Sequence, residues 1–220
     1  MTTVDLSAPR PLVLADLVPA VRSRAAVDTA LVVAGTLLIA GFAQLTITLP
    51  FTPVPISLST LAVMFGGAAL GARRGSLSVL LYVACGVLGA PVYADGNSGW
   101  AIASFGYVLG YLPASALAGH LARRGADRGP VRAFGLVALA SAVVYLGGVP
   151  WLMAFLDVDL ATAAQLGVWP FLVGDALKAA LVALALPGAW RLLGRHAHRP
   201  APAPRPEPAA TTATDVDEQR

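Results

Sequence analysis

The sequence is poor in charged residues, and it contains a single cysteine and a single lysine. Only 12% of the 220 residues are charged, whereas a soluble globular domain carries about 25%. Because 57% of the residues are hydrophobic, this deficit indicates that the chain is surrounded by lipid rather than water. The one cysteine, Cys85, excludes an internal disulfide and a cysteine-based metal cluster.

Residues that carry catalysis are equally scarce. The three histidines lie at the ends of apolar segments, at His120, His196 and His198, and no serine inside an apolar segment has a histidine base nearby. The sequence also contains no H-E-x-x-H and no P-loop. We therefore expect a protein that is not an enzyme, does not hydrolyse ATP itself, and holds no metal or cofactor.

Six apolar segments predict an all-α, polytopic membrane protein with six transmembrane helices. They cover roughly residues 25–49, 57–72, 75–90, 102–122, 131–156 and 170–193. Such continuous runs exclude a β-barrel, whose strands alternate in pieces of about 10 residues. The second and third segments are short, at roughly 24 Å each. Only Arg73, Arg74 and Gly75 separate them, which predicts a hairpin whose tip lies at a membrane surface.

Positive charges alternate between the connections that join these segments. Arginines lie before the first segment, between the second and third, between the fourth and fifth, and after the sixth. The other three connections, residues 50–56, 91–101 and 157–169, contain no Lys or Arg. The positive-inside rule places both termini and the arginine-bearing connections in the cytoplasm, so orientation explains the net charge of +3 better than nucleic-acid binding does. We expect residues 1–24 to be a cytoplasmic segment without a signal peptide, 25–193 the membrane domain, and 194–220 a disordered cytoplasmic tail.

The last apolar segment carries two charges of opposite sign. Asp175 and Lys178 are three residues apart, so they share one face of the predicted helix. Ionisable residues inside a membrane are costly and mark functional sites by default, although a structural ion pair is the alternative. With Pro170 in the first turn, the pair lies in the outer half of the bilayer. The lysine suits a carboxylate, and the aspartate suits a group rich in N–H donors.

Two outer connections are candidate walls of the same site. Residues 91–100 contain glycines and Asn97, a side chain that can both donate hydrogen bonds to a ligand and accept them from it. An ordinary glycine-rich turn explains the same residues equally well. Tyr93 and Tyr107 add aromatic surface with a hydroxyl group. Residues 49–55 contain three prolines and are a candidate lid.

Small residues recur on one face of several segments. Ala26, Ala30 and Ala34 repeat every four residues in the first segment, and the second and fourth contain G-x-x-x-G pairs. Such faces let helices approach closely. For the glycine pairs, packing within the chain is the preferred interpretation; for the alanines, a partner helix is a second possibility.

Taken in order, these motifs resemble the BioY family, the biotin-specific substrate-capture subunits of energy-coupling-factor (ECF) vitamin importers. The resemblance extends over about residues 25–193. The matching stretches are V-P-I-S-L-S-T-L-A at 54–62, L-G-A-R-R-G-S-L-S at 70–78, G-A-P-V-Y at 89–93, G-Y-V-L-G at 106–110 and P-F-L-V-G-D-A-L-K at 170–178. The G-D-x-x-K element is the most specific of them.

The resemblance implies a biotin site near the outer face of a bacterial plasma membrane. It assigns ligand contacts to Asp175 and Lys178, with Asn97 as the matching loop asparagine. It further implies docking on a scaffold membrane subunit driven by two cytoplasmic ATPases, with the Ala26, Ala30 and Ala34 face meeting the scaffold. The sequence departs from relatives at Ser59, where glutamine is frequent, and at residues 102–107, where G-P-T-G-G-Y is common.

Two other readings of the same residues remain. An autonomous carrier or channel would use the Asp–Lys pair as a proton relay and would need no ATPase module. A different small carboxylated vitamin would bind the same fold, whereas a ligand without a carboxylate would leave Lys178 unexplained.

Overall fold

The computed structural model describes residues 13–17 and 23–197. The α-helices of this part are α1 (Arg24–Ala43), α2 (Ser59–Leu70), α3 (Ala72–Val87), α4 (Phe105–Arg123), α5 (Pro130–Leu156), α6 (Leu160–Gly167) and α7 (Trp169–Ala197). The shorter elements are the 3-10 turns η1 (Leu14–Leu17), η2 (Ala94–Gly96) and η3 (Ala126–Arg128), and the strands β1 (Thr46–Ile47) and β2 (Ile56–Ser57). The predicted disordered tail lies largely outside the described residues.

The structure is mostly helical, and each of the six predicted apolar segments contains one helix. Among the described residues, α1, α5 and α7 are long and apolar enough to cross a membrane, and α2 is a shorter apolar helix. Two elements were not predicted: α6 lies within the connection 157–169, and β1 pairs antiparallel with β2 around the proline-rich loop. Their shortness concealed both, since α6 is only eight residues long and each strand only two.

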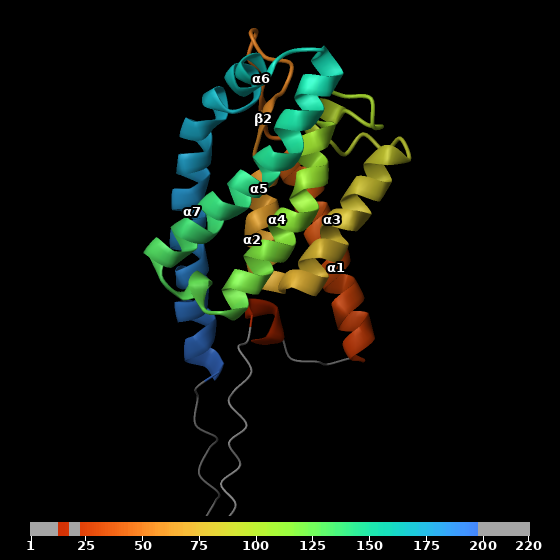
Figure 1. Ribbon diagram of the computed structural model, residues 1–220. Coiled ribbons are helices and arrows are strands. Elements are labelled where there is room, and N and C mark those ends of the chain that lie inside the picture. Colours follow the sequence, from red (N-terminus) through yellow and green to blue (C-terminus); the bar gives the residue numbers. More distant parts are fainter. Residues whose placement is uncertain (1–12, 18–22, 198–220) are drawn as a thin grey trace, which may run out of the picture.

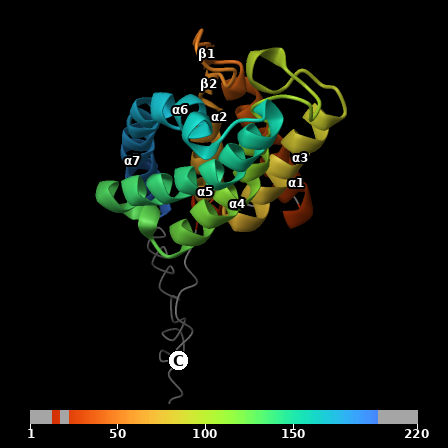
Figure 2. The same cartoon turned by 45° about the horizontal axis from the view of Figure 1, so that its top comes forward.

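The connections sort to the two ends of the helical bundle. Figure 1 shows the α2–α3 turn, the α4–α5 connection and the start of α1 at the lower end, whereas α6 and the β-hairpin lie at the upper end. The view in Figure 2, tilted by 45°, shows the same separation. The arginine-bearing connections therefore lie together, as the charge pattern predicts, while their side of the membrane stays a prediction.

Glycines let the central helices approach closely. A Cβ on Gly67 of α2 would collide with Ser115 of α4, and one on Gly119 of α4 would collide with the backbone of Ala72. Gly106 and Gly110 likewise face the backbone of α5. Both predicted glycine pairs thus include residues that pack within the chain, as preferred from the sequence. Gly71 alone links α2 to α3 and has φ = 85°, a conformation that favours glycine.

The lower end is fixed by a buried acid in η3. The Asp127 side chain is fully buried, and Trp190 Nε1 of α7 donates a hydrogen bond to it. Burial raises the pKa of the Asp127 carboxyl, which the tryptophan bond partly offsets. Arg128 stacks its guanidinium over the Trp190 ring, 5.0 Å from the centroid. These contacts hold α7 against the α4–α5 connection.

Because α4 packs closely at Gly119, a larger side chain at this position should lower the free energy of unfolding. We expect Gly119→Val to destabilise the protein by about 1–3 kcal/mol because the added methyl groups meet the backbone at Ala72. Gly135→Val is the matched control, since nothing lies within 4 Å of a Cβ on Gly135 of α5. Thermal unfolding in detergent measures both, and equal midpoints would contradict this account of the packing.

Candidate functional site

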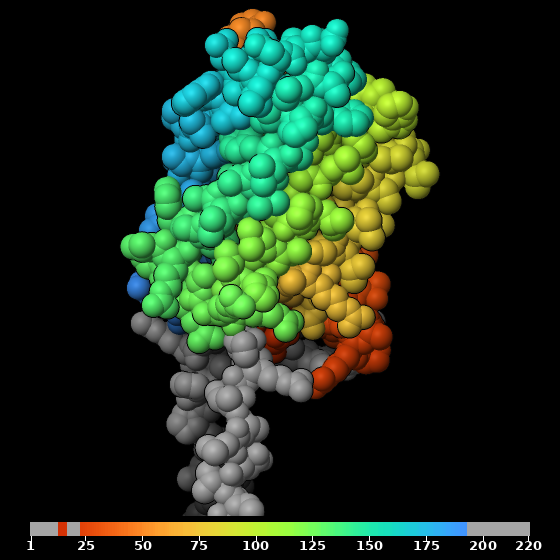
Figure 3. Space-filling view, viewed as in Figure 1, coloured from red at the N-terminus to blue at the C-terminus, as the bar shows by residue number. Residues whose placement is uncertain are grey.

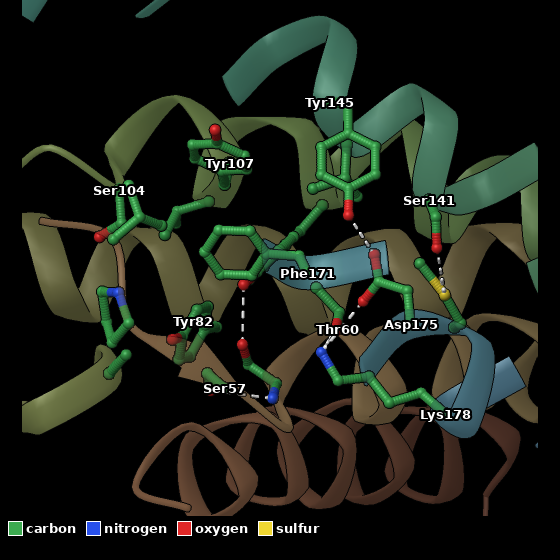
Figure 4. A pocket seen from close by; sticks show the side chains of 18 residues that line it. Ser57, Thr60, Tyr82, Ser104, Tyr107, Ser141, Tyr145, Phe171, Asp175 and Lys178 are labelled. Atoms are coloured by element: carbon green, nitrogen blue, oxygen red, sulfur yellow. Dashed lines mark hydrogen bonds and ion pairs between the residues drawn. The ribbon is translucent and has the colours of Figure 1, made fainter. Parts of the chain in front are cut away.

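A small cavity lies among α2, α3, α4, α5 and α7, and Figure 4 shows the side chains that line it. Its volume is about 50 Å³. Its lining is rich in aromatic side chains, with four tyrosines and Phe171. The tyrosines are Tyr82, Tyr107, Tyr111 and Tyr145. Side chains of α4 and α5 form a continuous outer face in this region of the molecule (Figure 3).

The Asp175–Lys178 pair lies in the wall of this cavity. Lys178 Nζ donates to Asp175 Oδ1 at 3.2 Å and to Thr60 Oγ1 of α2 at 3.0 Å. The Lys178 side chain is 7% exposed and that of Asp175 is 16% exposed. No described residue accepts the third ammonium N–H, so the lysine retains one donor for another partner. The structure therefore brings the two predicted charges together at the edge of a space that a ligand can share.

Tyr145 and Thr60 complete the polar cluster, and the sequence interpretation missed both. The Tyr145 hydroxyl of α5 donates to Asp175 Oδ2 (Figure 4), so each carboxylate oxygen has a donor. These contacts compensate for removing the charges from water. The sequence does contain a signal for Tyr145. Ser141 and Tyr145 are polar residues four positions apart in an apolar helix, so they share one helix face, and both line the cavity.

The other predicted ligand residues occupy three different positions. The Tyr107 ring lines the cavity, and its hydroxyl donates to Gly167 O at 2.9 Å. Tyr93 is fully buried beside the cavity rather than in its lining; its hydroxyl donates to Val83 O at 2.9 Å and its ring contacts Tyr82. Asn97 is exposed in the η2 loop, where its Nδ2 donates to Ala94 O at 2.8 Å. As ligand contacts, all three stay predictions.

Ser59, one of the two departures from relatives, also lines the cavity. Its hydroxyl shares a 2.7 Å hydrogen bond with Tyr111 OH of α4. A glutamine at this position would extend further into the space between α2 and α4. The other departure, residues 102–107, includes Ser104 and Tyr107 of the lining.

The proline-rich connection covers the upper side of the cavity. Val54 and Pro55 line it, and Thr52 Oγ1 donates to Leu166 O of α6 at 2.7 Å. The hairpin is also joined to the η2 loop, because the Thr46 hydroxyl donates to Asp95 and Gln44 Nε2 donates to Tyr93 O at 3.1 Å. Hydrogen bonds to α6 and to the η2 loop, together with the buried side chain of Val54, thus hold the cover in place, and a short hairpin held in this way can act as a lid.

The chemistry of this site favours binding over reaction. It offers an ammonium, a carboxylate, hydroxyl groups and aromatic faces, which suit a small ligand with both an acidic end and N–H donors. No group of three or more possible metal ligands occurs among the residues that the structure describes. Ligand pockets typically measure about 300–1,000 Å³, so the cover must move for a vitamin-sized molecule to enter a cavity of about 50 Å³.

Comparisons with known proteins agree with this picture. The sequence profile of the BioY family matches residues 15–195. The chain is 36% identical over 150 residues to the biotin transporter BioY of Rhizobium etli, covering 63% of this chain and 79% of that protein. It is 34% identical over 157 residues to biotin transporter BioY2 of Lactococcus lactis, and the match covers 70% of this chain and 85% of that protein. It also resembles the crystal structure of the S-component for biotin from an ECF-type ABC transporter, with a TM-score of 0.68 and 25% identity. This match covers 77% of this chain and 94% of that chain.

Proposed function

Because this chain belongs to the BioY family, we propose that it is a biotin-binding membrane subunit of a vitamin importer. In the proposal the subunit captures biotin at the outer face of the bacterial plasma membrane and delivers it to the cytoplasm when docked on an ATP-driven module. The protein is a transporter component, not an enzyme. The observation that carries the proposal is a charged Asp175–Lys178 pair in the wall of an aromatic cavity inside a BioY chain.

The functional groups of biotin match the polar cluster. Biotin carries a carboxylate at one end and a cyclic urea with two N–H groups and a carbonyl at the other. A carboxylate only accepts hydrogen bonds and an ammonium only donates them, so Asp175 receives the urea N–H and Lys178 donates to an oxygen of the ligand. The tyrosine and phenylalanine rings then enclose the apolar bicyclic body. Asn97 belongs to the loop that is joined to the lid by Gln44 and Thr46, and closure over biotin would add its contact. Tyr93, which is buried behind Tyr82, would contact the ligand only if the enlarged cavity reached its ring.

Six membrane crossings fit the arrangement of the bundle. The proposed crossings are α1, α2, α3, α4, α5 and α7, with α6 and the β-hairpin outside the cell. The grouping of the arginine-bearing connections at one end supports cytoplasmic termini. In this orientation the lid and the cavity face the side from which a nutrient arrives.

Docking on a scaffold subunit is proposed for the alanine face of α1. Ala26, Ala30 and Ala34 are all exposed, and the buried residues of α1 are limited to Gly35, Thr36, Ile39 and Ala43. Small side chains let a partner helix approach its backbone closely. The same scaffold would bring two cytoplasmic ATPases, since neither the sequence nor the site of this chain provides for ATP hydrolysis.

Removing either charge is expected to weaken biotin binding at least tenfold. A hydrogen bond to a charged group contributes about 1.5–3 kcal/mol, so Lys178→Ala and Asp175→Ala should each raise the Kd for biotin by about 10- to 150-fold. Radiolabelled biotin retained by the purified protein provides the measurement. Asp157→Asn, in the exposed α5–α6 connection, is the control and should bind as wild type does. If the wild-type protein does not retain biotin, the proposed substrate is wrong. If the two alanine variants bind biotin as tightly as wild type does, the proposed binding site is wrong.

Loosening the lid is expected to accelerate release of biotin. Thr52→Val keeps the shape of the side chain but removes the hydroxyl, which donates to Leu166 O and accepts from Val54 N. Only the first of these bonds joins the lid to α6, and it contributes about 1 kcal/mol. We expect the dissociation rate to rise about fivefold, measured by chasing labelled biotin with unlabelled biotin. Thr48→Val changes an exposed threonine of the same loop and should leave the rate unchanged. Equal rates for all three proteins would rule out the lid.

A bulky residue on the alanine face should separate transport from binding. Ala30→Phe is expected to retain wild-type affinity for biotin but to lower uptake tenfold or more in cells that contain the ATPase module, because the ring prevents close helix contact. Ala138→Phe, at an exposed position of α5, controls for the effect of a large exposed side chain. Normal uptake by Ala30→Phe would exclude this face as the docking surface. Uptake by wild type in cells without the module would favour an autonomous carrier.

A further inference from the structure

A second hollow lies between α1 and α3, and it shares no residue with the tyrosine-rich cavity. This α1–α3 groove has a volume of about 760 Å³. On α1 its lining residues are 25, 28, 29 and 32, and on α3 they are 73, 74, 77, 80, 81 and 84. Both sets follow the helical period, so each helix presents one face to the groove.

One end of the groove is basic. Arg74 pairs there with both Asp16 and Asp28, each at 2.8 Å, so these three side chains together carry one negative charge. Arg73 and Arg123 also line this end, and neither has an ion-pair partner among the described residues. With Arg73 and Arg123 included, this end of the groove carries a net charge of +1, supplied by the two arginines that have no ion-pair partner in the described part of the chain.

The amino terminus of α3 adds to this positive end. The Arg123 guanidinium lies beside Gly71, with Nε and Nη2 each 3.6 Å from where a Cβ of Gly71 would lie. Gly71 is the residue before the first turn of α3, and no side chain caps that helix. A cation next to an uncapped helix amino terminus is unfavourable unless an anion lies between them. Arg73 and Arg123 therefore border the same end of the groove, whereas the first amide of α3, at Ala72, packs against Gly119 of α4.

The rest of the groove is apolar and open to the surroundings of the bundle. Leu77, Leu80 and Leu81 of α3 are 44%, 52% and 39% exposed, and Val32 and Ala84 continue the lining. From Arg73 to Ala84, α3 rises by about 16 Å. This length is about half of the roughly 30 Å hydrocarbon thickness of a bilayer, so the groove extends through one leaflet from its basic end.

From these observations we propose that the α1–α3 groove binds one anionic phospholipid. The phosphate lies between Arg73 and Arg123, and one acyl chain lies along Leu77 and Leu81. The alanine face of α1 is about 150° around the helix from the residues that line the groove, so a lipid here leaves that face free. The proposal does not depend on the ligand of the tyrosine-rich cavity.

Native mass spectrometry of the purified full-length protein tests this site. The probes are phosphatidylglycerol and phosphatidylcholine with identical acyl chains, and glycerophosphoglycerol as a headgroup without chains. We expect wild type to bind phosphatidylglycerol more tightly than phosphatidylcholine. R73Q and R123Q should each lower the affinity for phosphatidylglycerol about fivefold, as for a contribution of about 1 kcal/mol per arginine, and Leu77→Gln should weaken both lipids. R132Q and Leu139→Gln, at exposed positions of α5 outside the groove, are the matched controls and should bind as wild type does.

Four results would overturn the proposal. Equal affinity for the two lipids would show that the groove does not select an anionic headgroup. Equal losses in R132Q and R123Q would show only a general attraction to basic surface. If glycerophosphoglycerol binds as tightly as the whole lipid, the acyl chains contribute nothing to binding in the groove. Unchanged lipid binding in R73Q and R123Q together with lost biotin uptake would assign the groove to another subunit instead.

Discussion

The burial of two opposite charges inside an apolar helical bundle is the constraint on which the rest of this structure depends. Asp175 and Lys178 would be expensive there without partners, and α2 and α5 supply those partners through Thr60 and Tyr145. This arrangement satisfies both carboxylate oxygens and two of the three ammonium hydrogens. Replacement of a buried ion pair by apolar residues of similar volume is often neutral or stabilising. The cost of the pair is therefore consistent with the proposed role in ligand binding.

Close helix packing holds the partners of the pair at the required distance. Gly67, Gly106, Gly110 and Gly119 allow α2, α4 and α5 to meet near their backbones, so side chains from three helices converge on a small cavity. The cover above it is a short hairpin, held by the buried side chain of Val54 and by hydrogen bonds such as that of Thr52 to Leu166 O of α6. A closely packed floor beneath such a cover is suited to capturing a ligand and releasing it later.

Much of the fold was predictable because lipid imposes simple rules on a sequence. Apolar length gave the six helical segments, and the alternation of arginines gave the ends at which the connections gather. Helical spacing alone placed Asp175 beside Lys178. Contacts between distant segments were beyond such rules: Thr60 and Tyr145 are ordinary residues until α2 and α5 are seen against α7. The position of Asn97 depends on an irregular loop with Asp95 at φ = 58°, which no periodic pattern specifies.

A crystal structure of the protein with bound biotin would test the central claim most directly. Biotin is predicted to lie in an enlarged tyrosine-lined cavity, with a urea N–H within hydrogen-bond distance of Asp175 and an oxygen within that distance of Lys178 Nζ. The proline-rich cover would close over the ligand. Biotin bound elsewhere, with the Asp175–Lys178 pair isolated from it, would contradict the account.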